Sequence, residues 1–169
     1  MVYKLVLGDW SDDGHGKYKE FLFDCNYNVS KIRQAYKDSC KKLGITFNHN
    51  EDYTGLNLGY GDKRQIWTEY EESQISPFAF NILKENGCFK NIFTNEEIKD
   101  IYFENGEYNE EFEDFLILNL EQCALLIMNF ISLSMPNDFT YNLVEEAIEP
   151  INGYWNKDLN VQFGYGLFY

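Results

Sequence analysis

The sequence predicts an α+β fold in which a small, mainly antiparallel sheet packs against about five helices. Two short apolar runs near the start flank a segment rich in glycine and aspartate, which is typical of a β-hairpin. Helix-capping residues recur through the middle of the chain, and the end has the composition of a closing strand. The 169 residues, 44% of them hydrophobic, suit a single globular domain spanning residues 1–169, with roughly 70% of the unfolded surface buried.

The N-terminal part is expected to form strand, loop, strand and helix in that order. Residues 2–7 and 20–25 are rich in β-branched and aromatic side chains, and the loop between them holds three glycines and three aspartates. Asn28 can cap a helix that ends at Gly44, because apolar residues then recur at helical spacing. One face of this helix carries Val29, Ile32, Tyr36, Cys40 and Leu43.

Two further helices are predicted from their first residues. Ser76 followed by Pro77 is typical of a helix start, and Gly87 is expected to end that helix. Thr94, with a glutamate three residues later, predicts a capping box for a helix that stops near Gly106.

The most apolar segment, residues 112–134, is predicted to be one long helix at the centre of the fold. Polar residues interrupt this segment and no Lys or Arg flanks it, which favours a core helix over a membrane span. After Pro136, residues 138–149 are expected to form another helix. Residues 65–70 and 161–169 are predicted strands, and the second of these closes the sheet beside the N-terminal hairpin.

Charge is distributed unevenly along the chain. The formal net charge is −14, yet residues 1–44 hold 8 basic and 6 acidic residues. Between Thr94 and Glu149 there are 14 acidic residues and a single basic one, Lys99. A negative field of this size attracts basic partners or cations and repels phosphate backbones, so direct nucleic-acid binding is not expected. A solvated surface that keeps the protein soluble is the simpler explanation.

The first functional hypothesis is a non-enzymatic protein whose acidic face docks on a basic protein surface. Immunity proteins and phage-encoded inhibitors work in this way, although no residue motif here matches theirs. The expected partner-binding residues are the acidic side chains Glu96, Glu97, Asp100, Glu104, Glu110, Glu111, Glu113 and Asp114. A structural or assembly subunit is a further alternative, since aromatic residues are abundant.

The second hypothesis concerns the loop of the N-terminal hairpin. A twelve-residue window places Asp9, Ser11 and Asp13 at positions 1, 3 and 5, and Glu20 at position 12. It resembles the calcium loop of the EF-hand family, and the resemblance covers these twelve residues alone. The resemblance implies a divalent-cation site, calcium in kind, in which the His15 carbonyl is the backbone ligand. An ordinary acidic loop is the other interpretation.

The window also departs from the EF-hand pattern. Gly16 stands where a branched apolar residue is usual, Lys17 is a cation beside the proposed metal, and the flanking segments are predicted strands rather than helices.

Catalysis is not supported by any sequence motif, so an enzyme is the less favoured class. There is no nucleophile-elbow, Walker, Rossmann or His-Glu-x-x-His pattern. His15 beside two aspartates could act as a general base, or could join His49 in a transition-metal site. The cysteines form no Cys-x-x-Cys pair, and Cys40 and Cys123 are expected to be buried thiols. With no signal-peptide pattern at the start, a cytoplasmic location is expected.

Overall fold

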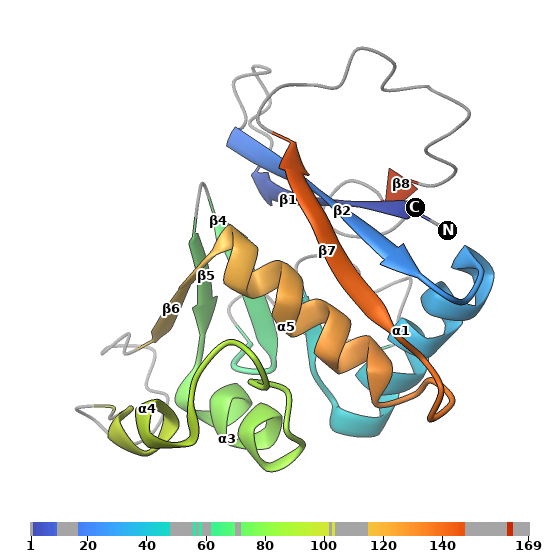
Figure 1. Cartoon of the computed structure of the whole chain (residues 1–169). Helices are drawn as coiled ribbons and strands as arrows, with labels where there is room; N and C mark the ends of the chain where they lie inside the picture. Colours follow the sequence, from blue (N-terminus) through green and yellow to red (C-terminus); the bar gives the residue numbers. More distant parts are fainter. Residues whose placement is uncertain are drawn as a thin grey trace.

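The described residues form two four-stranded sheets and a set of helices packed against them (Figure 1). The computed structural model describes residues 2–9, 17–47, 56, 58, 62–69, 72–101, 103, 115–147 and 162–163. Within these residues the mixture of helix and strand confirms the α+β class. The described residues form two sheets rather than the one that was predicted.

The first sheet has the strand order β7-β2-β1-β8. Its members are β1 (Val2–Asp9), β2 (Lys17–Cys25), β7 (Tyr141–Ala147) and β8 (Gln162–Phe163). β1 and β2 form the predicted antiparallel hairpin, in which Asp9 and Lys17 are the last pair before the connecting residues 10–16. β8 pairs with β1 in parallel, so the C-terminal strand does join the hairpin.

The second sheet has the order β3-β4-β5-β6. Its members are β3 (Thr46–Phe47), β4 (Gln65–Glu69), β5 (Glu72–Ile75) and β6 (Leu116–Asn119). β3 and β4 are parallel, whereas β4, β5 and β6 run antiparallel to one another. Contacts between β1 and β4 connect the two sheets.

The described residues contain four helices, compared with the five or so that were predicted. They are α1 (Val29–Leu43), α3 (Pro77–Glu85), α4 (Asn95–Asp100) and α5 (Leu120–Ser132). α5 contacts strands of both sheets and packs along α1, as Figure 1 shows. Most of its side chains are buried, including Cys123 and the run from Leu126 to Ile131. The centre of the core therefore lies along α5.

α1 forms as its sequence predicts. The Asn28 side chain accepts a hydrogen bond from the Lys31 N–H at 2.9 Å, which satisfies one of the free amides of the first turn. Gly44 has a φ of 68° and donates its N–H to the Cys40 carbonyl at 2.8 Å, so a left-handed residue ends the helix. Its buried residues are Ile32, Ala35, Tyr36, Ser39 and Cys40, at helical spacing on one face.

α3 is also confirmed, and α4 is confirmed at its start. Ser76 caps α3 and Pro77 occupies its first turn, while Gly87 follows the helix with a φ of 72°. Thr94 forms the predicted capping box with Glu97. However, α4 ends at Asp100 rather than near Gly106, because Ile101 adopts an extended conformation.

The prediction of a helix over residues 138–149 was wrong, because residues 141–147 form β7. Tyr141 and Leu143 are half-buried while Asn142 between them is exposed, which is the alternation of a strand. β7 pairs with β2 through most of its length, with a bulge near Leu22 and Phe23. The backbone N–H and C=O groups of β2 that do not face β1 thus gain hydrogen-bond partners in β7. This pairing outweighs the helical preference that the sequence analysis inferred for residues 138–149.

The predicted helix over residues 112–134 was wrong in its first part. Residues 116–119 form β6, which pairs with β5, and α5 begins only at Leu120. Asn119 marks the change, because its side chain accepts from the Gln122 N–H at 2.8 Å and its own N–H donates to the Gln122 side chain at 3.1 Å. This capping box had not been recognised in the sequence.

Candidate functional site

The acidic helix α4 is the described part of the predicted partner-binding face. Thr94 accepts from the Glu97 N–H at 3.1 Å, and the Glu97 carboxylate accepts from the Thr94 N–H at 3.0 Å. Acidic residues in a first turn also interact favourably with the helix dipole. Part of the acidity of α4 therefore has a structural cause.

Glu96 and Asp100 lie on the same side of α4, because they are four residues apart. Both are exposed, and no basic side chain in the described parts of the chain forms an ion pair with either. Like charges at this spacing disfavour a helix by roughly 0.2–0.5 kcal/mol. Among the described residues the pair thus has no ion-pair partner, and it forms an exposed negative site on α4.

Apolar contacts fix α4 to the body of the protein. Ile98 and Ile101 are partly buried and pack against the core. Phe103, just beyond the helix, meets the Phe80 ring of α3 edge-on with centroids 5.3 Å apart. The carboxylates of α4 consequently project from a supported helix. The remaining predicted partner-binding residues, Glu104, Glu110, Glu111, Glu113 and Asp114, lie outside the described residues.

The predicted cation loop falls mostly outside the described residues. Ser11, Asp13 and His15 belong to residues 10–16, which are not described, and for Asp9 and Glu20 only the backbone is. Glu20 pairs with Val6, three residue pairs from the Asp9–Lys17 pair, which is the last pair before residues 10–16. A loop that closed on Glu20 would have to bridge about 10 Å along the strand. The cation site stays a prediction.

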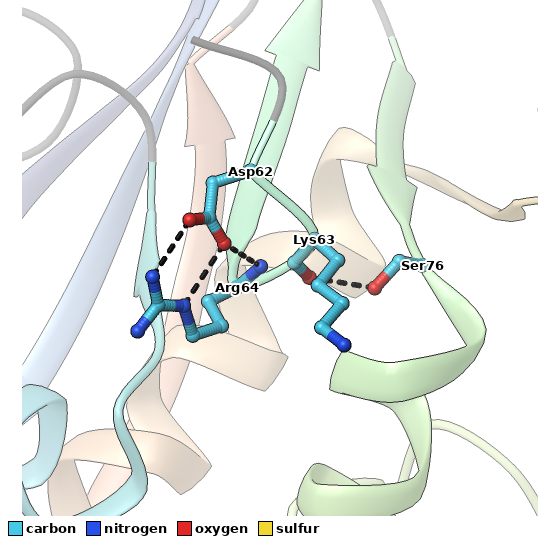
Figure 2. Close-up of polar contacts among 4 residues, drawn as sticks. All are labelled: Asp62, Lys63, Arg64 and Ser76. Atoms are coloured by element: carbon cyan, nitrogen blue, oxygen red, sulfur yellow. Dashed lines mark hydrogen bonds and ion pairs between the residues drawn. The ribbon is translucent and has the colours of Figure 1, made fainter. Parts of the chain in front are cut away.

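A charged turn before β4 was missed by the sequence analysis. The Asp62 carboxylate accepts three hydrogen bonds from Arg64, as Figure 2 shows. The donors are the Arg64 backbone N–H at 2.9 Å, Nε at 2.9 Å and Nη2 at 2.7 Å. Hydrogen bonds from the Arg64 guanidinium lower the pKa of Asp62. The Asp-Lys-Arg run before a β-rich segment was the only signal in the sequence.

This turn is attached to the start of α3. The Ser76 hydroxyl donates to the Lys63 carbonyl at 2.6 Å (Figure 2). The same hydroxyl accepts from the Ala79 N–H at 3.1 Å. The Lys63 ammonium lies 4.4 Å from the centroid of the Phe78 ring, which is 38% exposed. These contacts join β4 to α3 and have a structural role.

The four cysteines are buried and none is in a disulfide bond, which confirms the expectation of buried thiols for Cys40 and Cys123. Burial raises the pKa of Cys25, Cys40 and Cys88 to about 12. Such thiols are protonated at neutral pH and are poor nucleophiles. His15 and His49 lie outside the described residues.

The described residues contain no group of three or more His, Cys, Asp or Glu side chains arranged to hold a metal ion. Nor does this part of the chain include a helix of the length and apolarity needed to cross a membrane. Comparison with protein-family models, with curated proteins and with solved structures finds no match to the chain.

Proposed function

We propose that this chain is a non-enzymatic acidic protein that docks on a basic protein surface, as immunity proteins and phage-encoded inhibitors do. The observation that carries the proposal is the exposed pair Glu96 and Asp100 on one side of α4. The two carboxylates repel each other in the free protein, and a cationic group placed between them would replace that repulsion with attraction.

The charge of the whole chain supports the same role. A net charge of −14, concentrated after residue 44, speeds encounter with a cationic surface and discourages contact with nucleic acid. An acidic protein of this kind can occupy the basic cleft of a nucleic-acid-binding protein. We place this interaction in a reducing, cytoplasmic setting, which suits four cysteines that form no disulfide bond.

The test is capture of partners by the immobilised protein at low and at high salt. The wild-type chain should retain a basic partner at low salt and release it at high salt. The double variant Glu96→Gln and Asp100→Asn should retain roughly tenfold less. Asp38→Asn with Glu85→Gln is the matched control, because it removes the same charge from exposed positions on α1 and α3.

Capture of no basic partner at either salt would contradict the proposal. Equal loss of binding in the test and control variants would show that net charge, and not α4, directs the interaction.

A cation-binding hairpin is the second candidate function. The pairing of β1 with β2 up to Asp9 and Lys17 supports this candidate, because only seven residues, 10–16, separate the two strands and three of the predicted ligands, Ser11, Asp13 and His15, are among them. Millimolar calcium should then raise the melting temperature of the wild-type protein and leave Asp9→Ala with Asp13→Ala unaffected. The absence of any shift in the wild type would rule out this role.

A further inference from the structure

Strand β6 lies at an end of the second sheet, and among the described strands it has β5 as its single neighbour. Leu118 is fully buried, whereas Ile117 is 47% exposed. Ile117 and Phe78 are the two large hydrophobic side chains exposed in the described residues. An end strand that exposes an apolar side chain is a template for pairing with another strand.

The capping box of α5 shows which backbone groups of β6 face away from β5. The Asn119 N–H donates to the Gln122 side chain and is therefore turned away from β5. Residues of an antiparallel strand alternate between facing their neighbour and facing away. Ile117, two residues earlier, must then direct its N–H and C=O toward the free edge. By the same alternation, Leu116 and Leu118, which pair with Ile75 and Ser73, are the residues whose backbone groups face β5.

The charge around this edge is negative. Glu72 is exposed on β5, in register with Asn119, and Glu121 is exposed in the first turn of α5. Neither β5 nor β6 contains a basic residue. Glu72 and Ile117 lie on the outer face of the sheet, because the residues that alternate with them, Ser73 and Leu118, are buried.

We propose that β6 binds an extended segment of the basic partner by strand addition. The Ile117 N–H and C=O form two backbone hydrogen bonds with the added strand. On the outer face, an apolar residue of that strand covers Ile117, and Lys or Arg two positions away meets Glu72 or Glu121. This inference rests on the proposed function and specifies how part of the partner is held. Two hydrogen bonds make a weak contact alone, so the charges are required for binding.

The experiment uses the full chain and a blocked peptide, Thr-Lys-Thr-Val-Thr-Lys-Thr, which places lysine, valine and lysine on one face of a strand. Binding is followed by amide chemical shifts and by hydrogen exchange at Ile117. Addition of the peptide should shift the Ile117 resonance saturably and slow the exchange of its amide. The same peptide with glutamate in place of lysine should produce neither change.

Two variants separate the backbone from the side chain. Ile117→Pro removes the outward N–H without removing a bond to β5, and should weaken peptide binding about fivefold. Ile117→Thr keeps the N–H and a β-branched side chain, and should bind more tightly than the proline variant. The wild-type exchange measurement decides the matter if Ile117→Pro does not fold.

The outcomes distinguish the two proposals. Peptide binding that leaves the Ile117 amide unchanged would overturn strand addition while the acidic docking role stands. The absence of any binding by the lysine peptide at millimolar concentration would overturn both. Protection of the Ile117 amide without peptide, together with sedimentation as a dimer, would overturn the basic segment as occupant in favour of a second copy of this chain.

Discussion

Asn129 provides the most direct test of how the core is held together. This residue of α5 is 6% exposed, and its side-chain amide donates to the carbonyls of Cys88 and Lys90 at 2.7 and 2.8 Å. Its side-chain oxygen accepts a hydrogen bond from the Tyr141 hydroxyl. One side chain thus joins α5, the turn after α3 and strand β7.

Replacing Asn129 with alanine removes three hydrogen bonds in a buried place. Each hydrogen bond contributes about 1 kcal/mol net to stability. In the variant, the Cys88 and Lys90 carbonyls and the Tyr141 hydroxyl would lose their bonds to Asn129 in a place with little access to water. We expect the free energy of unfolding to fall by about 3 kcal/mol. For a chain of this length each kcal/mol corresponds to about 2–4 °C, so the melting temperature should fall by about 6–12 °C.

Urea and thermal unfolding, followed by circular dichroism, measure the change. Asn142→Ala is the matched control, because Asn142 is an exposed asparagine of β7, and its replacement should change stability by less than about 0.5 kcal/mol. Tyr141→Phe should show an intermediate loss of about 1 kcal/mol, since it removes one of the three bonds. A loss of unfolding free energy for Asn129→Ala equal to that of the Asn142→Ala control would refute the conclusion that these three hydrogen bonds stabilise the core.

Three further predictions concern the thiols, the charged turn and a helix end. Burial raises the pKa of Cys25 and Cys88 to about 12, so these thiols ionise at lower pH in the unfolded chain than in the folded protein. The free energy of unfolding should therefore fall as the pH rises above about 9. Alkylation of the two thiols should follow the urea unfolding curve rather than precede it. Arg64 lowers the pKa of Asp62, so this pair stabilises the fold at pH values above the pKa of Asp62 in the unfolded chain. The stabilisation is lost as the pH falls through the pKa of Asp62 in the folded protein. Arg64→Ala should raise the Asp62 pKa in a carboxyl-carbon NMR titration, and an unchanged pKa would contradict the contact. Gly44→Ala should cost about 1 kcal/mol in urea unfolding because φ is 68°, and Gly44→Asn should cost less; equal stability of all three proteins would exclude backbone strain at this position.

The features that sequence analysis predicted correctly are those with a local cause. Asn28 and Gly44 bound α1, and Ser76 with Pro77 starts α3, because a cap depends on side chains within a few residues of the helix end. The hairpin β1–β2 followed from two apolar runs joined by a turn-rich loop.

Features that depend on distant partners were missed. Residues 116–119 and 141–147 have apolar patterns that suit either a helix or a strand, and β5 and β2 supply the hydrogen bonds that decide between them. The candidate site was predictable in the same uneven way. Acidity near α4 is visible in the sequence, whereas the place of Ile117 on an end strand of the described sheet depends on the pairing of β6 with β5.

The sequence by itself determined the α+β class, the negative charge, the helix starts at Asn28, Ser76 and Thr94, and the N-terminal hairpin, because composition and short-range hydrogen bonds specify them. Tertiary structure alone decided that there are two sheets in the described residues, that α5 begins at Leu120, and that Ile117 is exposed on an end strand of the second described sheet. The physical reason is that the backbone N–H and C=O groups of an apolar run form hydrogen bonds either within a helix or with a neighbouring strand. Only the packed protein provides that neighbouring strand.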